Sequence, residues 1–415
     1  MADLKDACAR PSLTPVEEAL AQILAATTPV TETETVSLDA SYGRVLAAAV
    51  ISPVNVPPQD NSAMDGYSIC EADVKEYALV GQAFAGHPFT GDLNAGQCVR
   101  IMTGAPVPAG ATTVVMQENA DVTETPSGKV VSFSQALNPG DNIRRAGEDI
   151  KTGSEVLSAG RRLTPADCGL LASIGIPTVE VLRPIRVALL TTGDELVAPG
   201  QTLEDGQIYE SNSFVLRPIL QRLGAEITVL TAVEDNTDTI KAELASAADS
   251  HDVIITSGGV SVGEADYTRI AVEALGRLDL WKMAMKPGKP LAFGRIGDCL
   301  FLGLPGNPVS SLVTLHQVGL PMLRTLAGES VSPPLRIPAV ASVLLRKRPG
   351  RTDYQRGIAA LNTGGQLEVR STGQQGSGIL SSVSRANCFI VLEQDRGRVE
   401  AGETVMVELF DQWLC

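Results

Sequence analysis

Residues 252–266 read DVIITSGGVSVGEAD, and this stretch guides the interpretation of the whole chain. Its apolar run at 253–255 predicts a buried strand, the small residues at 256–259 predict a loop, and the carboxylates Glu264 and Asp266 belong to the helix expected next. Glycines at the carboxyl end of a buried strand let backbone N–H groups approach phosphate oxygens, and carboxylates suit a hard cation such as Mg²⁺. Because Gly-Gly after a strand more often forms a plain tight turn, the stretch by itself leaves both interpretations open.

The surrounding segment, residues 184–330, alternates apolar strands with amphipathic helices. Strands are expected at 187–190, 227–233, 253–255 and 299–302, with helices over 215–223 and 240–247. This alternation predicts a three-layer, doubly wound, mostly parallel sheet whose ligands bind at the carboxyl ends of the strands. Polar or glycine-rich loops follow all four strands, at 192–195, 234–236, 256–259 and 304–308. Each loop alone is typical of a helix cap or turn, but their convergence at one sheet edge favours a binding site.

Two helix starts suggest a domain that is interrupted by an insertion. The sequences TPVE at 14–17 and TPAD at 164–167 each combine a hydroxyl, a proline and an acidic residue placed for a capping box. We therefore expect residues 1–50 and 146–183 to form one small, split, elongated α+β domain.

The two remaining parts of the chain have β-rich patterns. Short β-forming runs broken by Gly, Pro and Asn-Pro-Gly predict an all-β insertion domain at 51–145. Similar runs separated by glycine-rich turns predict a C-terminal β-barrel domain at 331–415. The expected fold class is a multidomain α/β protein, in agreement with about three domains or more for 415 residues.

The charge of the chain limits its ligands. With 33 Lys and Arg against 48 Asp and Glu, the net charge is −15, which repels nucleic acid. An anionic substrate therefore has to be attracted by a local cluster of cations. No basic start followed by an apolar core opens the chain, and about 18 apolar residues never run together, so we expect neither export nor a membrane span.

Cysteine and histidine usage narrows the chemistry further. The seven cysteines are scattered and never form CxxC: Cys8, Cys70, Cys98, Cys168, Cys299, Cys388 and Cys415. This pattern disfavours a zinc knuckle or a redox pair and fits reduced thiols in the cytoplasm. The three histidines, His87, His251 and His316, lie in unrelated contexts, which disfavours a Ser/His/Asp triad or a histidine-based zinc site. Catalysis is then expected to depend on carboxylates, cations, hydroxyls and backbone amides, the groups used in phosphoryl transfer and oxyanion binding.

Seven motifs in order give the chain a resemblance to a known family. They are DNSAMDGY (60–67), RIMTGAPVP (100–108), TGDEL (192–196), TSGGVSVGEADY (256–267), KPGKP (286–290), LPGNPVS (304–310) and QRG (355–357). Together they resemble the molybdopterin molybdenumtransferase family, which includes the gephyrin E-domain type. The resemblance implies insertion of molybdate into the dithiolene of adenylylated molybdopterin, release of AMP and a requirement for Mg²⁺. It also implies a homodimer of four-domain subunits, in which the α/β domain of one protomer faces the β insertion of the other.

The resemblance also implies roles for individual residues. The candidates for binding molybdate are Lys286, Lys289, Ser310 and Arg356. The candidates for the pterin phosphate and its surroundings are Ser257, Gly258, Gly259, Ser261, Pro305 and Pro308. The carboxylates expected around Mg²⁺ or the pyrophosphate link are Glu195, Asp235 and Asp266, and Asp60 and Thr103 would reach the site from the partner subunit. Without the motif as context, a turn cap is the alternative role for Asp60, and simple solvent exposure is the alternative for the lysines.

Three other functions remain open from the sequence. The related molybdopterin adenylyltransferase has a domain like 184–330 but usually lacks the β insertion and the C-terminal β domain. A scaffold that binds a partner peptide, as in the gephyrin branch, is a second alternative, and delivery of tungstate instead of molybdate is a third. A molybdopterin adenylyltransferase and molybdoenzyme apoproteins or chaperones are the partners expected besides a second copy of the chain.

Overall fold

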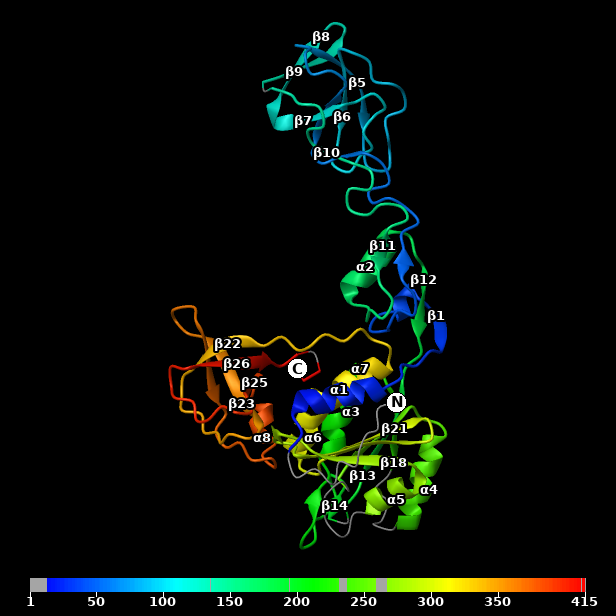
Figure 1. Ribbon diagram of the computed structural model, residues 1–415. Helices are drawn as coiled ribbons and strands as arrows, with labels where there is room; N and C mark the ends of the chain where they lie inside the picture. Colours follow the sequence, from blue (N-terminus) through cyan, green and yellow to red (C-terminus); the bar gives the residue numbers. More distant parts are fainter. Residues whose placement is uncertain are drawn as a thin grey trace.

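A computed structural model describes residues 13–134, 136–193, 195–230, 237–258, 267–411 and 413–414. The molecule is long: an all-β domain stands at one end, a narrow α+β domain follows, and a wider body at the other end holds an α/β domain and a β-barrel (Figure 1). This architecture confirms the expected fold class.

The α/β domain is built on a six-stranded sheet in the order β16-β13-β17-β21-β20-β18. The first four strands run parallel, whereas β20 and β18 pair in antiparallel fashion. The strands are β13 (Arg186–Thr191), β16 (Glu226–Leu230), β17 (Val253–Ser257), β18 (Arg277–Lys282), β20 (Pro290–Ile296) and β21 (Cys299–Leu304), and a separate ribbon pairs β14 (Leu196–Val197) with β15 (Ile208–Tyr209). The central strands are mostly apolar, as expected for a sheet that is covered on both faces.

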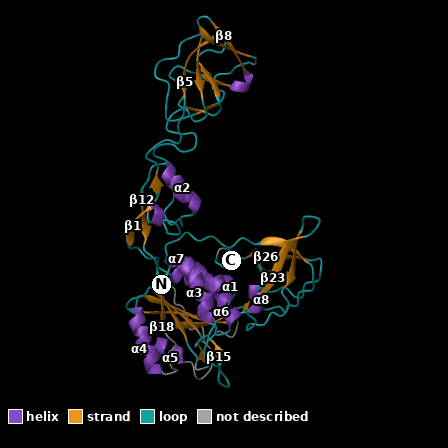
Figure 2. Cartoon of the chain, turned by 180° about the vertical axis from the view of Figure 1, so that it is seen from behind, coloured by secondary structure: helices purple, strands orange, loops and turns teal. Residues whose placement is uncertain are grey.

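Helices cover the two faces of this sheet (Figures 1 and 2). One face carries α1 (Val16–Ala26), α3 (Asn212–Arg222) and a continuous helical run of α6 (Pro308–Thr314), the π-helical η4 (Leu315–Gly319) and α7 (Leu320–Leu326), and the other carries α4 (Thr237–Ala248) and α5 (Tyr267–Leu275). Within β13, Val187 and Leu189 enter the first core while Ala188 and Leu190 enter the second. The two-residue period of a strand thus divides the apolar residues between two layers.

The first helix differs from its expected placement in the split domain. Its apolar stripe, Val16, Ala19 and Ile23, is buried in the core of the α/β domain. The spacing of a stripe identifies the buried face of a helix but not the surface that covers it. The capping box expected at 14–17 is also absent, because Thr14 donates its N–H to Lys282 and accepts from Ala284, which ties it to the chain after β18.

The narrow α+β domain is formed by segments on both sides of the insertion. It contains β1 (Thr33–Ser37) paired with β12 (Thr178–Leu182), β2 (Val50–Ile51) paired with β11 (Glu155–Leu157), the 3-10 helix η2 (Leu38–Ala40) and α2 (Pro165–Ser173). At the start of α2 the expected capping box is present: Thr164 accepts from the Asp167 amide, and the Asp167 carboxylate accepts from the Thr164 amide.

The insertion contains a six-stranded sheet in the order β7-β4-β6-β5-β9-β8 and a short ribbon of β3 and β10. Its elements are β3 (Asn61–Ser62), β4 (Gly66–Ile69), β5 (Tyr77–Ala83), β6 (Gln97–Ile101), β7 (Thr113–Met116), the 3-10 helix η3 (Gln117–Asn119), β8 (Ala120–Thr125), β9 (Gly128–Phe133) and β10 (Ile143–Arg144).

The C-terminal sheet closes on itself through pairing of β25 with β23, which makes a five-stranded barrel. Its elements are β22 (Ile337–Ala341), β23 (Thr352–Leu361), β24 (Leu367–Ser371), α8 (Ser381–Ser384), β25 (Cys388–Leu392) and β26 (Thr404–Leu409). A further short strand, β19 (Met285–Lys286), comes from the α/β domain and pairs with β23. Tyr354 and Phe389 of the barrel are buried in the same core as α1 and α7.

Among the described residues, no helix combines the length and apolar character needed to cross a membrane. The five cysteines within the described ranges are free thiols: Cys70, Cys98, Cys168, Cys299 and Cys388.

An ion pair at the start of β17 makes the stability of the α/β domain sensitive to acid. Asp252 accepts two bonds from the Arg183 guanidinium, at 2.7 and 2.8 Å, and a third from the Arg186 amide at 2.7 Å. Burial raises the pKa of Asp252, but Arg183 and the Arg186 amide lower it further, so this pKa lies below its usual 3.8. Such a carboxylate stabilises the fold above its unfolded pKa, and the contribution is lost as the pH falls through the folded value.

We therefore expect Asp252→Asn to cost about 2 kcal/mol of unfolding free energy at neutral pH. The difference from the wild type should stay constant between about pH 7 and 5 and shrink below about pH 4. Urea unfolding of both proteins across this range is the measurement. A difference that persists unchanged at pH 3 would show that the carboxylate charge is not its source.

Candidate functional site

Three loops meet at the carboxyl end of the parallel sheet and form what we call the strand-end cluster: Asn212, Ser257, Gly258, Gly306 and Ser311. Asn212, the first residue of α3, donates through Nδ2 to Ser257 Oγ and to the Gly306 carbonyl, both at 2.7 Å. Ser257 Oγ also lies 3.3 Å from Ser311 Oγ on α6. These contacts fix the ends of β17 and β21 against α3 and α6, as expected for a ligand site in an open α/β sheet.

Gly258 has a conformation that only glycine adopts without strain. Its φ is +99°, and a Cβ built on it would lie 2.8 Å from the Thr192 carbonyl oxygen. The Gly258 N–H donates to the Leu304 carbonyl at 3.1 Å, so this amide belongs to the sheet framework and is not a spare donor for phosphate. The remaining residues expected in the phosphate loop, Gly259 and Ser261, lie outside the described residues.

The loop after β21 leads directly into α6. Pro305 is buried, Pro308 occupies the first turn of α6, and Ser310 is buried within that turn. The Val309 amide donates at 3.0 Å to the carbonyl of Ser377, a residue of the barrel. The first turn of α6 thus lies between the strand-end cluster and the barrel.

Of the three expected metal-binding carboxylates, the structure describes only Glu195. Its side chain is exposed and turns back over Gly193, where an added Cβ would lie 2.6 Å from Oε2. Asp235 and Asp266 lie outside the described residues. Within the described ranges, no three His, Cys, Asp or Glu side chains come together as a metal site would require.

The KPGKP loop lies between α6 and the barrel. Gly288, at φ +100°, packs so closely on α6 that an added Cβ would lie 2.3 Å from Thr314 Oγ1. Lys286 Nζ pairs with Asp353 Oδ2 of β23 at 3.2 Å, whereas Lys289 is exposed. The other carboxylate oxygen, Asp353 Oδ1, is buried and has no hydrogen-bond partner among the described residues.

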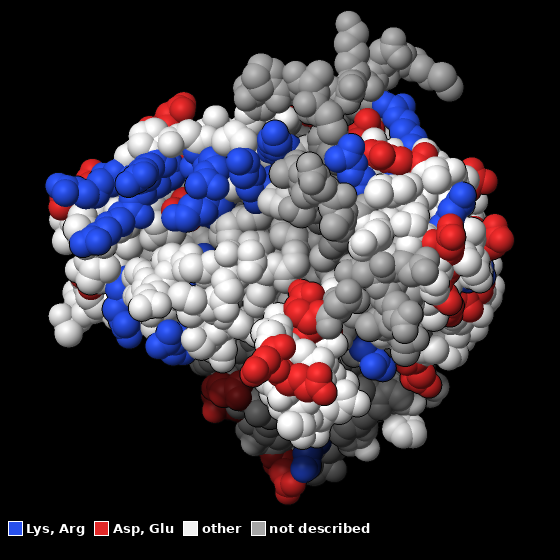
Figure 3. Space-filling view, turned by 90° about the horizontal axis from the view of Figure 1, so that it is seen from below, with Lys and Arg blue, Asp and Glu red and all other residues white. Residues whose placement is uncertain are grey.

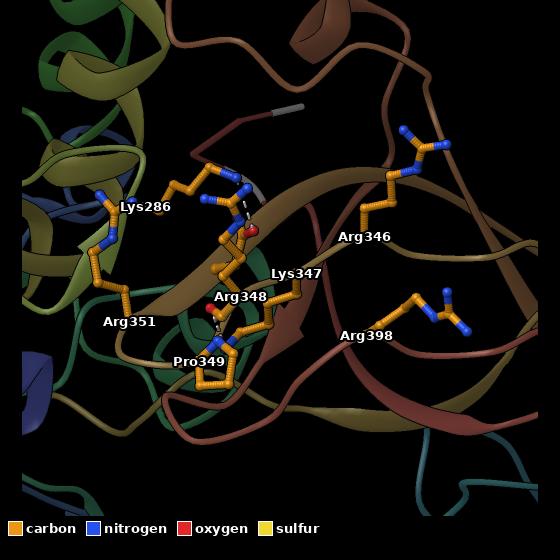
Figure 4. A pocket seen from close by; sticks show the side chains of 8 residues that line it. Lys286, Arg346, Lys347, Arg348, Pro349, Arg351 and Arg398 are labelled. Carbon is orange, nitrogen blue, oxygen red and sulfur yellow. Dashed lines mark hydrogen bonds and ion pairs between the residues drawn. The ribbon is translucent and has the colours of Figure 1, made fainter.

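Beyond Lys286, the structure reveals a cationic site that the sequence analysis missed. A pocket of about 360 Å³, here called the basic pocket, is lined by Lys286, Arg346, Lys347, Arg348, Pro349, Arg351, Asp353 and Arg398 (Figure 4). Figure 3 shows Lys and Arg side chains gathered along the barrel side of the molecule. The sequence did carry a signal, since RKRPGR at 346–351 places four cations within six residues of an acidic chain.

Arg356 lies where no ligand can reach it without rearrangement. Its side chain is 0% exposed on β23, and all three guanidinium nitrogens donate to the barrel: Nε to Ser382 Oγ at 3.1 Å, Nη1 to the Tyr354 carbonyl at 3.0 Å and Nη2 to the Gly376 carbonyl at 3.4 Å. Burial lowers the pKa of Arg356 to about 10, so the group remains charged at neutral pH. The arginine holds the 376–382 segment in place, and its expected role as a molybdate ligand stays a prediction.

The two residues expected from the insertion lie far from the strand-end cluster of the same chain (Figures 1 and 2). Asp60 pairs with Arg145 at 2.6 Å and accepts from the Ala146 amide at 2.8 Å, and that backbone bond is the main reason that the pKa of Asp60 is lowered. Thr103 donates its amide and its hydroxyl to Asp65, at 2.7 and 2.8 Å. Among the expected residues, the fold brings together Ser257, Gly258, Pro305, Pro308 and Ser310 within one chain.

Comparison with known proteins shows similarity to molybdopterin biosynthesis proteins over most of the chain. Residues 14–175 match the MoeA N-terminal region (domain I and II), 188–325 match a probable molybdopterin binding domain, and 338–410 match the MoeA C-terminal region (domain IV). A molybdopterin molybdenumtransferase of Haemophilus influenzae is 45% identical over 388 residues, 92% of this chain and 95% of that protein. Gephyrin of Dictyostelium discoideum is 32% identical over 446 residues, 95% of this chain and 62% of that protein. The crystal structure of a molybdopterin biosynthesis moeA protein from Pyrococcus horikoshii OT3 superimposes with a TM-score of 0.81 at 27% identity, covering 96% of this chain and 100% of that one.

Proposed function

Because this chain belongs to the molybdopterin molybdenumtransferase family, we propose that it transfers molybdenum from molybdate to the dithiolene of adenylylated molybdopterin and releases AMP. The observation that supports this reaction most is the strand-end cluster, where Asn212 joins the Ser257–Gly258 turn to the Gly306 loop. Its rigid glycine turns can bring the backbone close to an anionic substrate. Lys286 and Lys289 belong to the loop packed on α6 and would supply positive charge for molybdate, with Ser310 Oγ as a neutral donor.

The Mg²⁺ requirement is part of the proposal. The residues that would hold the ion are Glu195, Asp235 and Asp266, a donor set of carboxylates only, which suits this cation. Glu195 is exposed and forms no ion pair with any described residue, so its carboxylate is available to a cation. Bound there, the ion would neutralise phosphoanhydride oxygens that these carboxylates would otherwise repel.

A homodimer is the arrangement that would complete this site. Asp60 and Thr103 are fixed in the insertion by Arg145 and Asp65, away from the strand-end cluster of their own chain. In a dimer, the insertion of a second copy would bring the same two residues to the cluster. A cytoplasmic location is also proposed and agrees with the free thiols of the described cysteines.

We expect AMP release from adenylylated molybdopterin to depend on molybdate and on divalent metal. Molybdate should stimulate release, sulfate should not, and chelation by EDTA should lower the rate by roughly 100-fold or more, with recovery on addition of Mg²⁺. The measurement is AMP formed per unit time, with tungstate as a further arm that reports metal preference. Release that is indifferent to molybdate would contradict the proposal, and adenylylation of molybdopterin with ATP would assign the chain to the adenylyltransferase reaction.

A further inference from the structure

The basic pocket concentrates positive charge on a protein that is acidic as a whole. Six cationic side chains and one carboxylate line it, whereas the chain carries a net charge of −15. They come from three separate parts of the sequence: the KPGKP loop, the 346–351 turn and Arg398. Like charges gathered in this way repel one another, so the arrangement favours an anion at its centre.

Among the described residues, two of these six cations form ion pairs. Lys286 pairs with Asp353, and Arg398 pairs with Glu400. Arg346, Arg348 and Arg351, by contrast, form no ion pair with any residue that the structure describes. Arginine presents several N–H donors in a flat, fixed geometry that matches the oxygens of phosphate.

The turn that carries these arginines is held in place without using them. Lys347 is buried and donates through Nζ to the carbonyls of Gln394 and Arg396, at 3.1 and 2.7 Å. The Gly350 amide donates to the same Gln394 carbonyl at 2.8 Å. Since the backbone is fixed by Lys347 and Gly350, the three arginines are positioned on a rigid support and remain free to bind a ligand.

The size and lining of the pocket indicate the class of ligand. Its volume of about 360 Å³ is in the range of small-molecule sites and exceeds the needs of a single oxyanion. None of the described residues that line it is aromatic, so these residues offer charge but no surface on which a base could stack. An extended polyanion such as nucleic acid would meet the repulsion of the acidic remainder of the chain, whereas a small anion would respond mainly to charges within about 8 Å at physiological salt.

We propose that the basic pocket binds the phosphate groups of a small phosphorylated ligand through Arg346, Arg348 and Arg351. This site extends the proposed transferase function, because adenylylated molybdopterin carries a phosphoanhydride and the product AMP carries a phosphate. The identity of the ligand rests on that function. Lys286 contributes to the wall of the pocket from the loop that packs on α6, which connects the phosphate site with the proposed molybdate lysines.

Calorimetric titration of the full chain with pyrophosphate, AMP or adenosine tests this site at about 0.15 M salt, where long-range attraction is screened. The pocket variant is Arg346→Ala/Arg348→Ala/Arg351→Ala. A matched control removes three exposed cations elsewhere, Lys75→Ala/Lys151→Ala/Arg370→Ala, with the same change in net charge.

Pyrophosphate should bind the wild type, and the pocket variant should bind it at least about tenfold more weakly, while the charge-matched control binds it like the wild type. If AMP binds in the same way and adenosine does not, the released nucleotide is an occupant of the pocket. If pyrophosphate binds and AMP does not, the occupant is a ligand with two linked phosphates. Absence of pyrophosphate binding, an equal loss in the charge-matched control, or binding by the pocket variant that equals the wild type would overturn the proposal. None of these titrations requires turnover, so a failed transferase assay with intact pyrophosphate binding rejects the proposed function and leaves the phosphate site standing.

Discussion

Replacing Gly258 with alanine is expected to lower molybdate-dependent AMP release by roughly 100-fold or more, because a shift of about 1 Å in a catalytic loop has effects of that size. The new Cβ would lie 2.8 Å from the Thr192 carbonyl oxygen, and the backbone at φ +99° is unfavourable for alanine. The Thr192 carbonyl is a backbone group at the end of the neighbouring strand β13. The clash can therefore be relieved only by moving the backbone next to Ser257 or next to Glu195. The rate of AMP release and the thermal midpoint of unfolding are the measurements.

Gly365→Ala provides the matched control for this prediction. Gly365 also has a positive φ, +78°, but a Cβ there meets nothing within 4 Å. The substitution therefore introduces the backbone strain alone, about 1 kcal/mol, far from the strand-end cluster. If both variants retain wild-type rates, the close approach at Gly258 does not matter for the reaction.

Replacing Arg356 with alanine should cost roughly 3 kcal/mol or more of unfolding free energy, because three acceptors lose their donor and each buried unsatisfied group costs about 1–3 kcal/mol. The Tyr354 and Gly376 carbonyls and the Ser382 hydroxyl would lose their donor inside the barrel. Urea unfolding measures the effect. Activity should fall as well, because the 376–382 segment also accepts the Val309 amide at the start of α6.

Arg385 is a suitable control, because it donates to the Ser381 carbonyl from an exposed position, and its replacement by alanine should change stability by about 0.5 kcal/mol or less. Arg356→Lys distinguishes a structural role from a ligand contact. Lysine keeps the charge but cannot reach three acceptors, so a structural arginine predicts partial destabilisation. Unchanged stability with lost activity would instead support the role of Arg356 as a molybdate ligand that the family resemblance implies.

The α/β domain was predictable because its central strands are uninterrupted apolar runs. A strand buried on both faces is mostly apolar on both, and β13, β17 and β21 show this in the runs 187–190, 253–255 and 299–304. The antiparallel strands β18 and β20 were not predicted, because Arg277–Lys282 mixes charged and apolar residues and its pairing depends on tertiary contacts. Tertiary contacts also decide the placement of the first helix. Its apolar stripe could be predicted from the sequence, but the domain on which that stripe packs could not.

The strand-end cluster was partly predictable for a geometrical reason. Parallel strands place the loops at their carboxyl ends along one edge, so the Ser257–Gly258 turn and the Pro305–Pro308 loop had to be neighbours. The bonds of Asn212 could not be inferred, because they join residues 45 and 94 positions apart. The basic pocket required barrel closure to bring Arg398 and Lys286 to the 346–351 turn, and the burial of Arg356 has the same origin.

The pairing of β19 with β23 limits how independent the last two domains can be. Lys286 belongs to the α/β domain by sequence, yet its strand adds to the barrel sheet, and Tyr354 and Phe389 of the barrel help to fill the core beneath α1 and α7. A fragment that ends near residue 330 would expose this apolar surface and leave β19 without its neighbour. The α/β domain and the barrel therefore share a sheet and a hydrophobic core. Exchanging either domain for a homologous one would require redesign of the surface that they share.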